Sequence, residues 1–182
     1  MRAASDGVKS ARIGCLLRDM MQSTGIWTFD GETLAALALT ASEAGFSHLE
    51  VGGGQSFQIA LQNATNPYRR LRLIKQILDK HASALPLQIL LRGANQFGFH
   101  HFAHSVQKKN LDLLIDAGGD PDKSRALVIR IFDALNDVEN LRYCIEYLVD
   151  ANAQAERDGN KQVSVQAALS YVAPNEALNR AL

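Results

Sequence analysis

Short apolar runs alternate with helix-forming stretches along the whole chain, and this alternation limits the folds open to the sequence more than any other feature. A short apolar run that ends in polar residues is typical of a buried strand, whereas apolar residues three and four positions apart are typical of a helix. Repeated units of strand, loop and helix predict a parallel sheet joined by right-handed crossovers. The predicted strands are residues 11–17, 46–51, 86–91, 126–132 and 163–169.

Start and stop signals predict the helices between these strands. Asp30 suits an N-cap, and Gly45 ends the apolar pattern that follows it. Asn66, followed by a proline, is typical of a helix start, and a buried apolar stripe is expected in the helix that it opens. Two further helices are predicted over residues 102–117 and 138–155. The stripe consists of Leu71, Ile74 and Leu78.

Charged and amide residues come at or just after the ends of the predicted strands. Arg18 and Asp19 follow the first strand, and Glu50 lies near the end of the second. Because the carboxyl ends of parallel strands meet at one edge, where α/β folds bind their ligands, we expect these side chains to gather there. Asp19 offers an oxygen to a divalent metal, and Arg18 offers a planar fork to a carboxylate or an enolate. The third and fourth strands end in the clusters Arg92–Asn95 and Arg130–Asn136.

Structural roles compete with these functional ones. The pair at 18–19 also suits an ion pair that caps a loop, and Asp133 and Asn136 suit ties between a strand end and the next helix. His100 and His104 would share a helix face only if their helix began early, so a capping helix start is favoured over a zinc pair. Three glycines at 52–54 allow a sharp turn or a close approach to a ligand, but they do not match a phosphate-binding fingerprint.

The composition excludes some function classes. Charged residues make up 21% of the 182 residues and the formal net charge is zero, so nucleic-acid binding has no electrostatic support. No apolar run has the length of a membrane span, and residues 1–12 lack the apolar core of a secretory signal. We expect a cytoplasmic protein, with the mitochondrial matrix as the alternative because residues 1–12 carry three basic residues against one acid. Cys15 and Cys144 are expected to be buried thiols.

Several blocks of residues, in order, resemble the first half of the carboxyltransferase domain of biotin-dependent enzymes. This family includes pyruvate carboxylase, the oxaloacetate decarboxylase alpha subunit and the transcarboxylase 5S subunit. The similarity runs from about residue 13 to residue 174. The blocks are Leu17-Arg18-Asp19 with Gln22-Ser23, Leu49-Glu50-Val51 before Gly53-Gly54, Leu90-Leu91-Arg92-Gly93 with Asn95, and Arg130-Ile131-Phe132-Asp133-Ala134-Leu135-Asn136-Asp137.

The resemblance implies a (β/α)8 TIM barrel, of which this chain supplies about five units. It implies a single carboxyltransferase-like domain over residues 1–182 that stops before the family's metal-binding lysine and His-x-His pair. The implied reaction transfers a carboxyl group between carboxybiotin and a keto-acid such as pyruvate or oxaloacetate through a metal-stabilised enolate. The implied cofactors are a divalent metal (zinc, manganese or cobalt) and biotin on a carrier domain or subunit.

The resemblance also implies roles for individual residues. Asp19 matches the family's metal-ligating aspartate, and Gln22 matches, with Arg18, residues that hold the keto-acid or its enolate. Arg92 matches the arginine that binds the substrate carboxylate. Asn95 is grouped with Arg92 as substrate-binding, and Glu50 is expected to orient Arg18 through an ion pair.

Two other interpretations stay open. The chain could be a non-catalytic homologue or fragment that needs a partner chain, because five units of a barrel leave two strand edges and an apolar face uncovered. A homo-oligomer would suit those edges. A related metal-dependent aldol lyase or acyl-CoA condensing enzyme would share the Arg-Asp pair, but the Arg92 and Asn136 blocks favour the carboxyltransferases.

Overall fold

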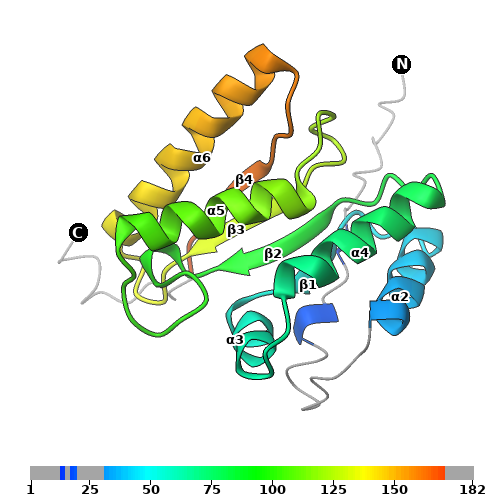
Figure 1. Ribbon diagram of the computed structural model, residues 1–182, viewed down its shortest axis with the longest axis horizontal. Coiled ribbons are helices and arrows are strands. Elements are labelled where there is room, and N and C mark those ends of the chain that lie inside the picture. Colours follow the sequence, from blue (N-terminus) through cyan, green and yellow to red (C-terminus); the bar gives the residue numbers. More distant parts are fainter. Residues whose placement is uncertain (1–12, 15–16, 20–30, 171–182) are drawn as a thin grey trace, which may run out of the picture.

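The computed structural model describes residues 13–14, 17–19 and 31–170. Four parallel strands form one sheet in the order β1-β2-β3-β4, which is also their order in the sequence (Figure 1). Every pair of neighbours is parallel. The strands are β1 (Leu49–Gly52), β2 (Leu87–Leu91), β3 (Val128–Phe132) and β4 (Ser164–Ala168).

The helices form a single layer against this sheet. Helix α2 packs on α4, α4 on α5, and α5 on α6, so these four longer helices lie side by side in the order in which they occur in the chain. Sequential parallel strands with all their connecting helices in one layer make a segment of a (β/α) barrel, whereas a doubly wound sheet places helices on both faces. The helices are α2 (Gly31–Glu43), α3 (Gly54–Gln62), α4 (Pro67–Lys80), η1 (Gly93–Asn95), α5 (His104–Gly118) and α6 (Glu139–Asp158).

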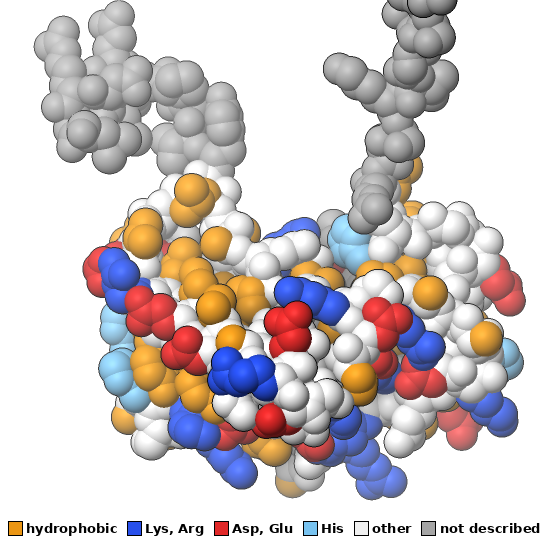
Figure 2. All heavy atoms as spheres, turned by 90° about the horizontal axis from the view of Figure 1, so that it is seen from above, with side chains coloured by type: hydrophobic (Ala, Val, Ile, Leu, Met, Phe, Trp, Pro, Cys, Tyr) orange, Lys and Arg blue, Asp and Glu red, His pale blue; other side chains and the backbone are white. Residues whose placement is uncertain are grey.

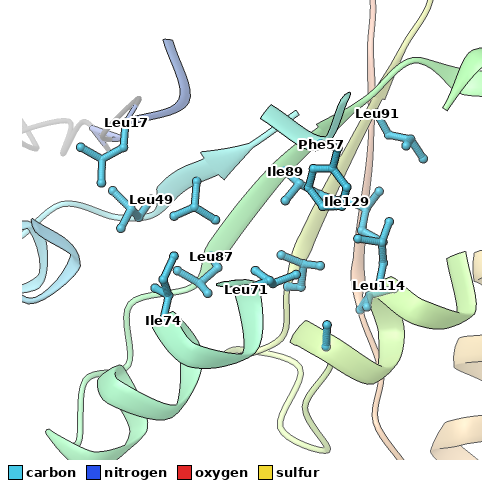
Figure 3. Packing of buried hydrophobic residues seen from close by; sticks show 14 of the residues in the cluster. Leu17, Leu49, Phe57, Leu71, Ile74, Leu87, Ile89, Leu91, Leu114 and Ile129 are labelled. Carbon is cyan, nitrogen blue, oxygen red and sulfur yellow. The ribbon is translucent and has the colours of Figure 1, made fainter. Parts of the chain in front are cut away.

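The prediction of a strand over residues 11–17 is wrong for the residues that the structure describes. Ile13 and Gly14 have no regular structure, and residues 17–19 are helical. The carbonyl of Ile13 accepts a hydrogen bond from the Ser47 amide at 2.8 Å, beside the entry to β1. Leu17 is buried in the same cluster as Leu49 (Figure 3), so its apolar character reports core packing rather than strand pairing. A short apolar run does not separate these two cases.

The other four predicted strands are confirmed within a few residues at their ends, and so are the four predicted helices. Asn66 caps α4 as predicted, since its side chain accepts from the amides of Tyr68 and Arg69 at 2.9 and 3.2 Å. The predicted stripe of this helix is buried against the sheet (Figure 3). Gly45 follows α2 with a φ of 78° that favours glycine.

Helix α3 was not predicted, because the three glycines at 52–54 indicate a sharp turn or a close approach to a ligand rather than a helix start. The helix begins at the third of them, Gly54, and lies directly after β1. The hydroxyl of Ser56 accepts the Gly53 amide and donates to the Gly53 carbonyl, both at 3.0 Å. This local pairing supplies the start signal that the glycines do not give.

Alternate residues along each strand face opposite ways, and the two faces of the sheet differ in chemistry. The residues that face the helix layer are apolar and buried, and each such leucine or isoleucine contributes about 2 kcal/mol of burial free energy. They include Leu49, Leu87, Ile89, Leu91, Ile129 and Ile131. The opposite face carries polar residues at Glu50, Gln88, Arg130 and Gln166.

The surface carries both signs of charge close together. On the face seen in Figure 2, basic and acidic side chains are interspersed, and no extended patch of one sign is visible there. Across the described part of the chain, no helix is both long enough and apolar enough to span a bilayer. Cys144 is a buried free thiol, as predicted, whereas Cys15 lies outside the described residues.

Candidate functional site

A buried carboxylate organises the polar face of the sheet. Glu50, in β1, is 2% exposed, and its Oε1 forms an ion pair with Nε of Arg18 from the helical turn. Its Oε2 accepts a hydrogen bond from Nε2 of Gln88 at 2.6 Å and lies 4.0 Å from Nη1 of Arg130. A buried charge is tolerated only when it is paired and hydrogen-bonded, and here both oxygens have partners. The expected ion pair between Arg18 and Glu50 is therefore present.

The polar contacts continue to β4. Nε of Arg130 donates to the side-chain oxygen of Gln166 at 3.2 Å, and these two residues are direct register partners. His48 directly precedes β1, at the opposite end of this row of polar side chains from Gln166. Burial first, and then the positive charge of Arg130, lowers the pKa of His48. Gln88, Arg130 and Gln166 thus link all strands from β1 to β4 across one face.

Arg92 leaves the end of β2 and is held by the loop that follows it. Its Nη1 donates to the Gly98 carbonyl at 2.8 Å, and its guanidinium lies 4.6 Å from the ring centroid of Phe99. Burial, and then the positive charge of Arg18, lowers the pKa of Arg92. Two like charges are therefore brought close together, and the Glu50 carboxylate that pairs with Arg18 offsets part of their repulsion.

The glycines at the start of α3 make room for both arginines. A Cβ atom added at Gly53 would lie 2.7 Å from Cδ of Arg18, and one at Gly54 would lie 2.6 Å from Cζ of Arg92. Both glycines thus lie against arginine side chains of the chain itself, and the close approach to a ligand stays a prediction. The first amides of a helix have no partner within the helix, and its N-terminus favours negative charge. Arg18, Arg92 and the start of α3 together suit a carboxylate or an enolate oxygen.

The other predicted site residues are placed less completely. Asp19 lies in the helical segment next to Arg18 and is exposed, while Gln22 lies outside the described residues. Asn95 belongs to the Arg92 loop, where its amide donates to the Arg92 carbonyl at 2.8 Å. Among the residues that the structure describes, no three His, Cys, Asp or Glu side chains gather closely enough to hold a metal ion. The described residues alone therefore do not form a metal site around Asp19.

The expected tie from the end of β3 to the next helix is observed for Asp133, whereas Asn136 makes a different structural contact. Oδ2 of Asp133 accepts from the amides of Leu135 and Asp137 at 2.8 and 3.0 Å, which ties the strand end to α6. Asn136 exchanges two hydrogen bonds with the backbone of Ser170, at 2.7 and 3.0 Å, and joins this loop to the end of β4.

The histidines near α5 have aromatic neighbours. That helix starts at His104, so His100 and His104 are not one helical turn apart within it. His104 stacks on Tyr143, with ring centroids 4.1 Å apart, and His100 packs against Phe102.

Three side-chain amides near the site, those of Gln88, Gln96 and Gln166, were not predicted from the sequence to be part of it. Gln88 and Gln166 stand in strands, and the signal that could have found them is a polar residue on the inward face of a sheet next to Glu50 or Arg130. Gln96, in the Arg92 loop, is 3% exposed, and no pattern in the sequence marks it as a buried residue of the site.

The fold is part of a parallel barrel, and the guanidinium groups of Arg18 and Arg92 lie near the carboxyl ends of its strands. No family model matches the chain. It is 31% identical over 140 residues to a pyruvate carboxylase subunit of Methanothermobacter thermautotrophicus, a match that covers 76% of this chain and 23% of the relative. It is 27% identical over 142 residues to the methylmalonyl-CoA carboxyltransferase 5S subunit of Propionibacterium freudenreichii, with 78% and 26% covered.

A solved structure agrees with these relatives. The carboxyl transferase domain of Rhizobium etli pyruvate carboxylase, determined with pyruvate, superposes with a TM-score of 0.70 at 26% identity and covers 96% of this chain and 27% of that one. The chain belongs to the carboxyltransferase domain family of biotin-dependent enzymes and forms an incomplete TIM barrel. It spans about a quarter of the length of the curated relatives that it matches.

Proposed function

We propose that this chain forms the keto-acid-binding part of a site that transfers a carboxyl group between carboxybiotin and a keto-acid such as pyruvate or oxaloacetate. The observation that carries the proposal is the meeting of Arg18 and Arg92 at Gly53 and Gly54, where α3 begins. Family membership supports carboxyl transfer in general. The arrangement of this chain's own cations supports an anionic substrate at this edge.

In the proposed reaction, Arg92 binds the substrate carboxylate through two parallel N–H donors, because a guanidinium matches a carboxylate in shape. Arg18, oriented by Glu50, stabilises the oxygen that gains negative charge when the keto-acid becomes an enolate. Gln22 and Asn95 add hydrogen bonds to the same molecule. Carboxybiotin, when its carrier delivers it, would supply the carboxyl group as carbon dioxide, and the ureido nitrogen left behind would take the proton that the keto-acid loses on becoming the enolate. The enolate carbon would then bond to the carbon dioxide, and the reverse sequence would decarboxylate oxaloacetate.

The metal part of the proposal depends on ligands from elsewhere. Asp19 has the chemistry of a ligand for zinc, manganese or cobalt, but the described residues offer no complete set of donors around it. Lysine and histidine ligands of the family type would have to come from further chain or from a partner.

The remaining partners follow from the partial length. Because the chain spans about a quarter of its relatives, we propose that residues 1–182 act as one carboxyltransferase-like domain with the rest of a barrel supplied by further chain or a second chain. Biotin would arrive on a carrier domain or subunit, in the cytoplasm or the mitochondrial matrix. The second candidate, a non-catalytic homologue that needs a partner, is favoured by β4, where Gln166 and Ala167 are exposed at the end of the sheet. A homo-oligomer is one way to cover it.

The test measures binding of pyruvate to the chain by calorimetry or NMR. Replacing Arg92→Lys removes the bidentate fork and keeps the charge, so we expect affinity to fall about tenfold or more. Arg72→Lys is the matched control, because Arg72 pairs with Asp116 on the helix layer and should leave the affinity unchanged. Equal affinities for the chain and its Arg92→Lys variant would contradict the proposal.

A further inference from the structure

We propose that Gln96 is a positioning residue for Arg92: its buried side-chain amide locks the loop after β2 in the one backbone shape that sends Arg92 toward the start of α3. The inference rests on the proposed function for the meaning of Arg92 as a carboxylate ligand. The side chain of Gln96 is buried below the backbone of the loop and would not touch the substrate.

The loop is a closed turn made by backbone hydrogen bonds. The Arg92 amide donates to the Gln96 carbonyl at 3.0 Å, and the Gln96 amide donates to the Gly93 carbonyl at 3.0 Å. The Asn95 amide donates to the Arg92 carbonyl at 2.8 Å. Gln96 therefore closes the turn with both of its backbone groups, its carbonyl on Arg92 and its amide on Gly93.

Gln96 closes the turn in a backbone conformation that few residues adopt. Its φ of 52° and ψ of −112° lie in a region that favours glycine, and strain of this kind persists only where the surroundings fix it. Gly93, at the other end of the turn, also has a positive φ, and a Cβ there would lie 2.5 Å from the Asn140 carbonyl oxygen in α6. The turn is thus strained and pressed against a helix.

Hydrogen bonds of the Gln96 side-chain amide hold the turn in this strained conformation. Its Nε2 donates to the Gly93 carbonyl at 2.8 Å and lies 3.1 Å from Sγ of Cys144 in α6. Its Oε1 accepts from Nδ2 of Asn110 in α5 at 2.6 Å. Both ends of a buried amide are satisfied, and each bond is available only while the turn keeps its shape.

Two further contacts connect this network to α4 and α3. Oη of Tyr68, in α4, donates to Oδ1 of Asn110, and burial raises the pKa of Tyr68 to about 12, so the hydroxyl keeps its proton. Phe97, the next residue, stacks on Phe57 of α3 with ring centroids 3.7 Å apart. The Arg92 loop is thereby fixed to four helices, including the one whose N-terminus Arg92 approaches.

The experiment reads the order of Arg92 directly, through its guanidinium N–H signals in a nitrogen–proton NMR spectrum of the full chain. Arg92→Lys assigns the signals of Arg92 by their loss, and those of Arg18 serve as an internal reference. In Gln96→Met, which keeps the length and removes the amide, we expect the Arg92 signals to broaden or move to the position of a solvated arginine. The Arg18 signals should stay in place, and the affinity for pyruvate should fall about tenfold.

Gln107→Met is the matched control. Gln107 is a buried amide that bonds the Phe102 carbonyl and Cys144 rather than residues 92–96, so its variant should leave the Arg92 signals unchanged. If Gln96→Met does not fold, Gln96→Gly decides by the same measurements, because glycine takes the positive φ without strain.

Three results separate the possibilities. Unchanged Arg92 signals in a folded variant would overturn the inference. Loss of the Arg18 and Arg92 signals together would also overturn it, because it would show a general structural role. If the unaltered chain fails to bind pyruvate while the Arg92 signals still depend on Gln96, the positioning role stands and the proposed function fails.

Discussion

At the edge where the strands begin, Arg72 lies beside Asp116 and Lys75 lies 2.7 Å from Asp120, whereas at the edge where they end, Arg18 and Arg92 lie near each other. At the first edge, the basic and acidic side chains pair with each other within the helix layer and the adjacent loop. The second edge holds two cations against a helix N-terminus, with one carboxylate, Glu50, buried behind Arg18. Charges that are satisfied pairwise serve stability, and cations gathered beside each other leave attraction for a ligand.

Glu50→Gln should give the largest effect on stability that this comparison predicts. The substitution removes the charge that pairs with Arg18 in the sheet interior, and breaking such a pair should lower the free energy of unfolding by about 3 kcal/mol. Urea denaturation followed by circular dichroism measures the change. Asp116→Asn at the other edge is the control and should cost less than about 1 kcal/mol. Equal losses at the two edges would remove the contrast between them.

Gly54→Ala should separate binding from stability. The added Cβ meets the end of the Arg92 side chain, which is flexible and can move away, so the thermal midpoint should change by only a few degrees. Arg92 would then leave the start of α3, and the affinity for pyruvate should fall about tenfold. Gln55→Ala, one residue further along α3, is the control that changes the same turn without this clash. Unchanged affinity in Gly54→Ala would show that the approach of Arg92 to α3 does not matter for the ligand.

The smallest effect concerns pH at the edge where the strands begin. A hydrogen bond from Arg72 lowers the pKa of Asp116 below its ordinary value of 3.8. A lowered pKa in the folded state contributes stability above the unfolded pKa and loses it as the pH falls through the folded pKa. The free energy of unfolding should therefore fall between pH 5 and pH 3, and the Asp116–Arg72 pair should account for on the order of 0.5 kcal/mol of that fall. Asp116→Asn should remove this share and leave the contributions of the other carboxylates, and 1 M salt should weaken it.

Much of the fold was predictable because its signals are local. The caps at Asn66 and Gly45 and the period of the apolar residues found four strands and four helices. The helical turn at Leu17 and helix α3 were missed, because a three-residue apolar run and a glycine triplet each fit more than one backbone. At the site, the pairing of Arg18 with Glu50 followed from the family pattern. The Gln96 amide did not, because its partners are 3 to 48 residues away and only the packed helices bring them together.

The polar row on the inner face of the sheet also specifies strand register. Shifting a strand by one residue would turn its apolar side chains away from the helices, so the apolar pattern alone excludes that error. A shift by two residues keeps every apolar side chain on its proper face and would pass this test. It would, however, separate Glu50 from Gln88 and Arg130 from Gln166, leaving a buried charge without its amide partner. The polar row that holds Glu50 behind Arg18 therefore also disfavours the strand alignments that the apolar pattern alone does not distinguish.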